Sequence, residues 1–256
     1  RDGSYERLEG FLYYYFKEDF SDKIRMIKAD LSKDLKLSEM LPGDVDLVCH
    51  CAADVRHYVQ DRKMMQNLNV GGTKRLLEYA EKYQIPFAHI STASIGGDHF
   101  LGNEKDTFVF TEEDFDIGQN WTENAYLESK FLAEALVYDA VKRGLNARVF
   151  RMGRLVGRNS DGRFQINPKT NAAYRLLAGL QLMEKIDDRL GQVPYELSPV
   201  DLSAKAVFEL RCEAGTTLHS INPKPCTLKD VCMVLNEDRS YEDGDDPEGY
   251  LASVQE

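Results

Sequence analysis

Hydrophobic positions in this chain follow two alternating patterns. Segments with apolar residues every three or four positions predict amphipathic helices, and short apolar runs that end in small or polar residues predict strands. The helical pattern covers residues 4–17, 65–83, 122–142 and 171–186, the segment after Pro199, and residues 226–236. The strand pattern covers residues 23–30, 45–55, 85–97, 145–157 and 217–222. Helices and strands in alternation are typical of a parallel sheet covered by helices, which is an α/β fold.

The same patterns suggest a division of the chain. A length of 256 residues suffices for one large domain, or for a main domain with a smaller appendage. We interpret residues 1–157 as the main domain, and residues 158–198, where the pattern loosens, as a small substrate-side element. Residues 199–236 supply the remaining strand and helices of the main part. The acidic segment 237–256 is expected to be a poorly ordered tail.

Charge and cysteine content narrow the class of ligand. The formal net charge is -11, and such a surface repels phosphate backbones, so we expect no nucleic acid partner. Any anionic ligand must therefore be bound by local positive charge. The five cysteines lack metal-ligand spacing, which predicts reduced thiols, no metal site and a cytoplasmic protein. The sequence shows neither a membrane-length apolar run nor a signal-peptide pattern, so we expect no membrane partner.

Polar and small residues gather where the predicted strands end. In an open α/β sheet, ligands bind at the carboxyl ends of the strands. These ends are Asp30, Cys51 to Ala53, Ser91 to Ser94, and Arg151 to Gly153. Small residues leave room for a ligand against the backbone, and hydroxyl or carboxylate groups can hold a dinucleotide and a reacting carbonyl.

Tyr126 and Lys130 lie four residues apart in the predicted helix 122–142, so they share one helix face. Reduction of a carbonyl by a nicotinamide needs a hydride on carbon and a proton on oxygen. A nearby ammonium would lower the pKa of the Tyr126 phenol and prepare it as a general acid. Thr92 could complete an oxyanion pocket, with Ser91 and Ser94 as alternatives. The Tyr and Lys spacing alone also fits ordinary surface neighbours.

Six stretches together resemble an extended short-chain dehydrogenase/reductase, and most closely the thioester reductase domains that end nonribosomal peptide synthetases and carboxylic acid reductases. They are VDLVCHCAADVRHY, NLNVGGTKRLLEYA, HISTASIGG, the Tyr126-x-x-x-Lys130 helix, RMGRLVGRNSDGRF and SPVDLSAKAVFEL. They occur in the family order across most of residues 24–222, and the ordered set is fairly specific. The resemblance implies a Rossmann-like, doubly wound parallel sheet with a small substrate-side subdomain.

The resemblance also implies roles for single residues. Thr92, Tyr126 and Lys130 match the catalytic triad, with Tyr126 as proton donor and Lys130 lowering its pKa and binding the nicotinamide ribose. The implied contacts with an NADPH cofactor are Asp30 and Leu31 at the adenine, Cys51, Ala52 and Ala53 along the dinucleotide, Asn69 in support from the neighbouring helix, and Met152 and Gly153 at the nicotinamide. From the residues alone, Asp30 could equally cap its own turn, and Asn69 could be a satisfied buried amide.

The family pattern begins before residue 1 of this sequence. Its first strand and its Gly-x-x-Gly-x-x-Gly phosphate loop are missing here, so the chain as given lacks the main phosphate-binding segment and could be inactive by itself. Arg1 matches the arginine that ends the second family strand, where it would pair with the 2'-phosphate of NADPH. Arg7 is a second candidate for that contact.

The resulting hypothesis is an NADPH-dependent reductase domain that follows synthetase modules in the same polypeptide. It would release a thioester on the phosphopantetheinyl arm of a carrier protein as an aldehyde, or continue to the alcohol. One alternative is another extended short-chain reductase or epimerase that acts on a small ketone or a sugar nucleotide. Another is a binding or structural module that keeps the fold without the chemistry. The segment 158–195 separates the first two hypotheses, because a sugar-nucleotide site needs groups for a second diphosphate.

Overall fold

The computed structural model describes residues 5–56, 61–100, 109–122, 124–165, 171–182, 187–211 and 216–235. The chain forms two compact units, and it passes between them more than once. The first unit comprises Arg1–Met152 and Ala206–Ser220, and the second comprises Gly153–Lys205 and Ile221–Glu256. The unit boundaries therefore follow packing, and neither unit is one continuous stretch of sequence.

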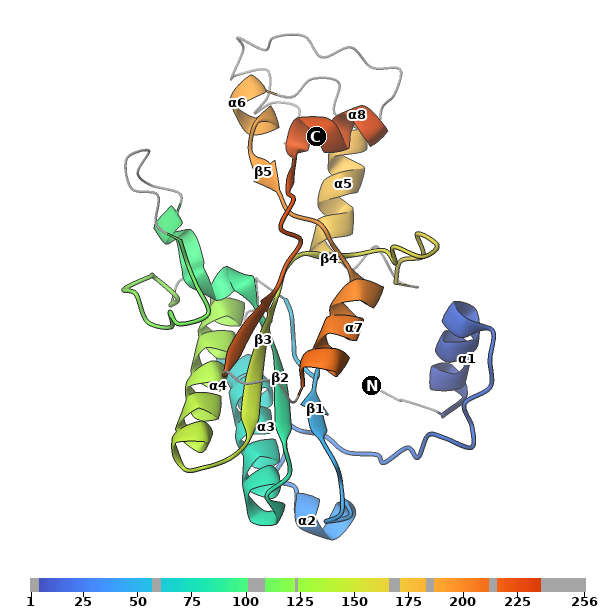
Figure 1. The fold of residues 1–256 in the computed structure, drawn as a ribbon, viewed down its shortest axis with the longest axis vertical. Helices are drawn as coiled ribbons and strands as arrows, with labels where there is room; N and C mark the ends of the chain where they lie inside the picture. Colours follow the sequence, from blue (N-terminus) through green and yellow to red (C-terminus); the bar gives the residue numbers. More distant parts are fainter. Residues whose placement is uncertain are drawn as a thin grey trace. The chain divides into compact units, whose positions relative to one another are not determined.

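A four-stranded parallel sheet forms the centre of the first unit (Figure 1). Its strands lie in the order β1 (Val48–His50), β2 (Phe87–Thr92), β3 (Ala147–Met152) and β7 (Thr217–Ser220). In this register Thr92 pairs with Met152, so the carboxyl ends of β2 and β3 lie side by side. The predicted α/β fold with a parallel sheet is confirmed.

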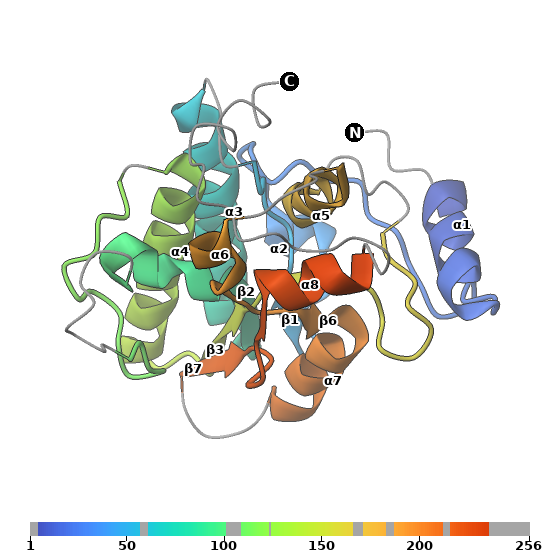
Figure 2. The ribbon, with the colours of Figure 1, turned by 90° about the horizontal axis from the view of Figure 1, so that it is seen from above.

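Helices α3 (Arg62–Tyr83) and α4 (Ala125–Lys142) lie side by side on one face of this sheet (Figures 1 and 2). Each begins at a capping residue: the Asp61 carboxylate accepts a hydrogen bond from the Met64 backbone N–H, and Asn124 caps α4. The first unit also contains α1 (Tyr5–Phe16), α2 (Leu37–Met40) and the 3-10 segment Ala93–Phe100. The helices predicted over 4–17, 65–83 and 122–142 are therefore confirmed.

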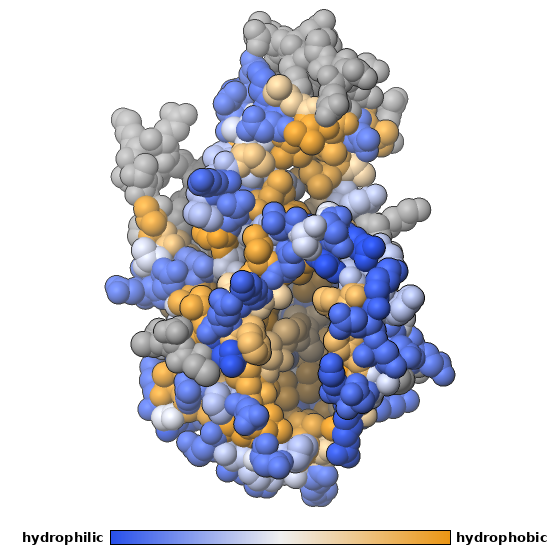
Figure 3. Space-filling model, turned by 45° about the vertical axis from the view of Figure 1, so that its right-hand side comes forward, coloured by the Kyte–Doolittle hydropathy of each residue, from blue (hydrophilic) through white to orange (hydrophobic). Residues whose placement is uncertain are grey.

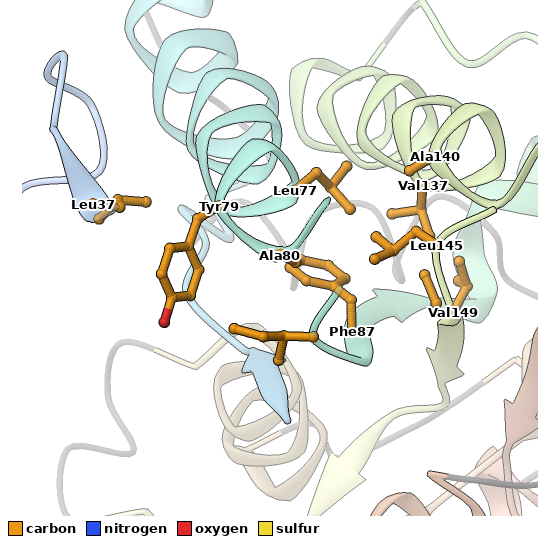
Figure 4. Packing of buried hydrophobic residues seen from close by; sticks show 11 residues of the cluster. Leu37, Leu77, Tyr79, Ala80, Phe87, Val137, Ala140, Leu145 and Val149 are labelled. Carbon is orange, nitrogen blue, oxygen red and sulfur yellow. The ribbon is translucent and has the colours of Figure 1, made fainter. Parts of the chain in front are cut away.

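The main core fills the space between the sheet and the two helices (Figure 4). Leu77 from α3 and Val137 from α4 meet Phe87 and Val149 from the strands, and all four are at most 3% exposed. The opposite face of the sheet carries a second cluster, in which Val207 of α7 (Val200–Leu210) packs with Ala88, Phe150 and Met152. Burial on both faces explains why these strands read as continuous apolar runs.

The second unit has its own small core. Its elements are β4 (Leu155–Val156), α5 (Ala172–Leu182), α6 (Asp188–Gly191), β5 (Pro194–Tyr195), β6 (Ser198–Pro199), β8 (Cys226–Thr227) and α8 (Leu228–Leu235). Strands β4 and β6 pair in parallel, and β5 and β8 pair antiparallel. Leu180 of α5 and Tyr195 of β5 pack with Leu228, Val231 and Cys232 of α8.

This packing differs from the division that the sequence suggested. The sequence assigned residues 226–236 to the main part and residues 158–198 to a separate element. Instead α8 buries its apolar face against α5 and β5, so both segments lie in one unit. Contacts between segments far apart in the sequence decide this grouping. The predicted tail 237–256 lies outside the described residues.

One predicted strand is wrong. Residues 23–30 form no strand, and β1 is the edge of the described sheet on that side. A strand exists only where its backbone N–H and C=O groups pair with a neighbour, and none of the described strands pairs with this segment. The apolar pattern alone could not supply that partner.

Some large apolar side chains remain at the surface, where hydrophobic and hydrophilic residues alternate (Figure 3). They include Val109, which is 71% exposed, and Phe208 of α7, which is 64% exposed. Scattered apolar residues are normal on protein surfaces. They assign no binding site by themselves.

Candidate active site

The start of α4 places Tyr126 and Lys130 against the sheet. The Asn124 side-chain oxygen accepts hydrogen bonds from the backbone N–H groups of Tyr126 (2.9 Å) and Leu127 (3.3 Å), so the helix begins at a defined residue. Lys130 follows Tyr126 by one turn and is almost fully buried. Its Nζ donates a hydrogen bond of 2.5 Å to the carbonyl oxygen of Ile90 in β2. The lysine side chain therefore crosses from the helix to the strand.

Thr92 meets Tyr126 at the carboxyl end of β2. The two side chains are hydrogen-bonded, and Thr92 Oγ1 also accepts a hydrogen bond of 3.2 Å from the Ser94 backbone N–H. The structure thus brings Thr92, Tyr126 and Lys130 together at one edge of the sheet. Ser91 points to the opposite face of β2 from Thr92, because side chains alternate along a strand. Of these two neighbours, Thr92 is the one bonded to Tyr126.

Burial dominates the titration of both helix residues. It raises the pKa of Tyr126 to about 12, and the hydrogen bond with Thr92 opposes that rise. It lowers the pKa of Lys130 to about 8, while Glu134 and Cys51 act in the opposite direction. Burial is the largest cause of the Tyr126 shift and acts against the expected lowering, and the lowering of the Tyr126 pKa by Lys130 stays a prediction. Tyr126 is therefore a protonated hydrogen-bond donor at neutral pH.

Asn69 of α3 connects two parts of the site. Its Oδ1 accepts from the Asp54 backbone N–H (2.7 Å), and its Nδ2 donates to the Asp54 carbonyl (2.9 Å) and to Ser129 Oγ (2.9 Å). Ser129 Oγ in turn donates to the carbonyl oxygen of Tyr126 (2.7 Å). The buried amide thus fixes the segment after β1 to the first turn of α4, which fits the predicted supporting position. These contacts are those of a satisfied buried amide, which is the alternative interpretation, and the role of Asn69 in support of the cofactor site stays a prediction.

Small residues follow β1 at the predicted dinucleotide surface. Cys51 and Ala52 are exposed and Ala53 is half-buried. The Sγ atoms of Cys49 and Cys51 lie 3.7 Å apart, and the four described cysteines are free thiols, as predicted. This hydrogen bond lowers the pKa of Cys49 to about 7 and raises that of Cys51. The end of β1 therefore leaves an open, small-residue surface.

Leu31 lies against α3, and Asp30 precedes it in an exposed turn. Asp30 Oδ1 accepts hydrogen bonds from the backbone N–H (3.0 Å) and hydroxyl (2.7 Å) of Ser32. Asp30 thus caps its own turn, as the alternative interpretation of this residue expected. The Leu31 carbonyl accepts from Arg75 Nη1 (2.9 Å), and a Cβ on Gly72 would come within 3.2 Å of Leu31 Cβ. Gly72 thus permits this segment to approach the helix closely. Adenine contacts by Asp30 and Leu31 remain predictions.

The other predicted cofactor residues are Met152, which pairs with Thr92 in the sheet, together with Gly153, Arg7 and Arg1. Met152 ends β3 in the first unit, and Gly153 begins the second unit. A Cβ on Gly153 would come within 2.5 Å of the Glu196 carboxylate, which accepts a hydrogen bond from the Arg154 backbone N–H (2.6 Å). Arg7 lies within α1, and Arg1 is among the residues that are not described.

The sequence indicated no contact between two charged residues of the first unit, Glu134 and Arg151. Glu134 follows Lys130 by four residues, and its carboxylate pairs with Arg151 of β3 at 3.0 Å, with both side chains fully buried. Within the second unit, the Glu196 carboxylate lies where a Cβ on Gly153 would be, so a larger residue at position 153 would have to displace that carboxylate. The spacing of Glu134 after Tyr126 and Lys130 was a visible signal. The sequence named Arg151 only as part of a strand end, and its pairing with Glu134 is identified by their contact, as is the position of Glu196 beside Gly153.

The described residues fit the nicotinamide ribose end of a dinucleotide. Two hydroxyls and a buried ammonium gather beside an open surface of small side chains, which is a donor set suited to ribose hydroxyls and a carbonyl oxygen.

Across the described ranges, no group of three His, Cys, Asp or Glu side chains is placed to hold a metal ion. None of the helices described is long and apolar enough to cross a membrane.

Comparison with known sequences gives a consistent set of relatives. The family model described as "Male sterility protein" matches residues 2–207. A linear gramicidin synthase chain of Brevibacillus parabrevis is 26% identical over 241 residues, which are 90% of this chain and 4% of that protein. Glycine betaine reductase ATRR of Emericella nidulans is 29% identical over 233 residues, which are 84% of this chain and 17% of that protein. The chain thus spans less than a fifth of either relative.

Solved structures support the same fold. A thiolation-reductase di-domain from an archaeal non-ribosomal peptide synthetase superposes with a TM-score of 0.82 at 28% identity, covering 98% of this chain and 68% of that one. The aureusimine biosynthetic cluster reductase domain superposes with a TM-score of 0.71 at 24% identity, covering 84% and 56%. The second likeness concerns the fold alone, and together they confirm the predicted Rossmann-like class.

Proposed function

Because the chain belongs to the male sterility protein family, an NAD-binding family, we propose that it is an NADPH-dependent reductase domain that releases a carrier-bound thioester as an aldehyde. The observation that carries this proposal is the meeting of Thr92, Tyr126 and Lys130 at the carboxyl ends of the parallel strands. Ligands of open α/β sheets bind at that edge. A nicotinamide cofactor follows from the family, and its phosphorylated form is part of the proposal.

The residues of this chain would supply the proton and the oxyanion contacts. When bound, the nicotinamide would give a hydride to the thioester carbonyl carbon. The hydroxyls of Thr92 and Tyr126 would donate hydrogen bonds to the carbonyl oxygen as negative charge develops there. Tyr126 would transfer its proton to that oxygen, and loss of the thiol from the resulting hemithioacetal would leave the aldehyde. A Tyr126 pKa of about 12 keeps that proton in place until the oxyanion forms.

Lys130 would hold the nicotinamide ribose. Its Nζ donates one hydrogen bond to the Ile90 carbonyl, and an ammonium carries three N–H donors, so further donors are available at this edge. Cys51, Ala52 and Ala53 would lie along the dinucleotide, with Asp30 and Leu31 toward the adenine. Asn69 would keep the first turn of α4 in register with these contacts. Arg1 and Arg7 are proposed for the 2'-phosphate, and Met152 and Gly153 for the nicotinamide side.

A carrier protein is the proposed partner. The solved relative at 28% identity is a di-domain in which a thiolation domain and a reductase belong to one synthetase. We therefore propose a thioester on a phosphopantetheinyl arm as substrate and synthetase modules in the same polypeptide as neighbours. The proposal also includes a cytoplasmic location and, as a further step, reduction of the aldehyde to the alcohol.

The test is reduction of an acyl-pantetheine thioester by the complete natural protein, followed as loss of NADPH absorbance with the aldehyde trapped as an oxime. We expect Tyr126→Phe to lower kcat by at least about 100-fold, since the phenol proton is lost. Tyr13→Phe, which removes an exposed phenol of α1, is the matched control and should keep full activity. Unchanged turnover in Tyr126→Phe would overturn the assignment.

A further inference from the structure

A buried ion pair lies one helical turn after the proposed catalytic lysine, between α4 and β3. Arg151 Nη2 and Nε donate to Glu134 Oε2 at 3.0 and 3.2 Å, and both side chains are fully buried. Arg151 also donates to Tyr138 Oη (3.1 Å) and to the Thr111 carbonyl (3.3 Å), and its guanidinium lies 4.6 Å from the Phe110 ring centroid. Buried charges are tolerated when partners surround them in this way. The guanidinium therefore holds the carboxylate in one orientation.

Glu134 and Lys130 share the face of α4 that is turned to the sheet. They lie four residues apart, one helical turn, and Tyr126 precedes Lys130 by another turn. Lys130 reaches β2 through the Ile90 carbonyl, and Glu134 reaches β3 through Arg151. The same face thus carries the proposed acid, the ammonium and a fixed carboxylate, in that order along the helix.

The groups facing Lys130 from each element leave Glu134 as its main negative neighbour. From β1 and the residue after it come His50 and Cys51, and from β2 comes His89. Burial lowers the pKa of His50 to about 4 and that of His89 well below its usual range, so both rings are neutral near pH 7. The Cys49 contact and burial raise the pKa of the Cys51 thiol, which keeps it neutral as well.

Glu134 is itself constrained from several sides. Arg151 faces it from β3, Tyr138 Oη donates to its Oε2 at 3.3 Å, and Lys130 acts on it along α4. Burial raises the pKa of Glu134, and the charges of Arg151 and Lys130 oppose that rise. Arg151 and Lys130 therefore favour the charged form of Glu134, and Glu134 in turn favours the charged form of Lys130.

We propose that Glu134, held by Arg151, is a positioning residue that keeps the Lys130 side chain charged and directed to the end of β2. This inference rests on the proposed function, because Lys130 is there the group that holds the nicotinamide ribose. The inference adds that reductase activity depends on the Glu134–Arg151 pair, which would contact neither substrate nor cofactor.

The first test measures the lysine itself, without cofactor. In the full 256-residue chain labelled with ¹³C at lysine Cε, the Lys130 signal is assigned by its loss in Lys130→Arg, and its titration midpoint is read by NMR. Glu134→Gln keeps an acceptor for Arg151 but removes the charge, so we expect the Lys130 midpoint to fall by about one pH unit. Asp139→Asn, which removes an exposed carboxylate of α4, should leave the midpoint unchanged. An unchanged midpoint in Glu134→Gln overturns the inference.

A second variant separates charge from packing. Glu134→Met with Arg151→Met removes both charges and replaces them with apolar side chains, which often restores stability lost by breaking a buried pair. We expect this double variant to melt at a higher temperature than Glu134→Gln while its Lys130 midpoint stays low. A midpoint that returns to the native value would show that packing alone sets it, and would overturn the inference.

The activity measurement distinguishes this inference from the proposed function. In the complete natural protein, the alkaline limb of kcat/KM should move to lower pH in Glu134→Gln by the same amount as the NMR midpoint. Thioester reduction with an unmoved limb would reject the role of Glu134 and leave the proposed function standing. A moved NMR midpoint without any thioester reduction would reject the proposed function alone.

Discussion

At the scale of single residues, burial decides the protonation of the proposed catalytic groups. Tyr126 is held protonated and Lys130 has a pKa of about 8, and in both cases desolvation is the largest cause. The sequence identified these two residues by their spacing and their place among ordered motifs. It gave no indication that burial raises the Tyr126 pKa, because spacing along a helix carries no information about how much water reaches a side chain.

A carboxylate in the second unit gives a prediction for the pH dependence of stability. Asp201 accepts hydrogen bonds from the backbone N–H groups of Asn159 (2.8 Å) and Ser160 (3.1 Å), and the first of these is the largest cause of a pKa lowered to about 2. An unfolded Asp titrates near about 3.9. A lowered folded pKa contributes stability that is present above the unfolded value and is lost as the pH falls through the folded one.

We therefore expect Asp201→Asn to melt below the native protein near neutral pH. The difference in Tm should shrink as the pH falls from about 4 to about 2, because the native Asp201 is then protonated as well. Calorimetry across this range checks the prediction. A Tm difference that stays constant down to a pH of about 2 would contradict the assigned hydrogen bonds.

At the scale of elements, the helices followed from local sequence and the strands did so less reliably. Helices α3 and α4 are capped by Asp61 and Asn124, whose side chains satisfy free backbone N–H groups, so each helix start depends on residues next to it in the sequence. The segment 23–30 has an apolar pattern but no partner strand among the described residues. A helix is hydrogen-bonded within itself, whereas a strand depends on a neighbour that its own sequence does not contain.

The cap of α4 supports both the stability of the helix and the placement of Tyr126. Asn124→Ala removes the acceptor for the N–H groups of Tyr126 and Leu127, so we expect a loss of about 1 kcal/mol in the free energy of unfolding. Asn124→Asp keeps a capping oxygen and is the matched control. Urea denaturation of the three proteins measures the difference. Equal destabilisation by Ala and Asp would show that the cap is not the source.

At the scale of the whole molecule, each of the two units has a hydrophobic core of its own. The first core lies between the parallel sheet and helices α3 and α4, and the second joins α5, β5 and α8. The sequence predicted a main domain and a smaller substrate-side element. It assigned α8 to the main part, because an amphipathic pattern shows that a helix has an apolar face without showing which surface covers it.

The second core should respond to a cavity of its own. Leu180 is 3% exposed and packs within this core, so we expect Leu180→Ala to destabilise the second unit by about 2–5 kcal/mol. Amide hydrogen exchange should show the greatest loss of protection in α5 and α8. Leu77→Ala, a matched cavity in the first core, should instead expose amides of α3 and β2. Identical exchange patterns in the two variants would contradict the division into two cores.

The sequence by itself determined the alternation of helices and strands, the α/β class, the family resemblance and the candidate triad of Thr92, Tyr126 and Lys130. These depend on periodicity, residue spacing and the order of motifs, all of which can be read along the chain. Only the tertiary structure decided the Tyr126 pKa, the packing of α8, and the Glu134–Arg151 pair beneath Lys130. Desolvation and contacts between distant segments arise when the chain packs, and no local pattern encodes them.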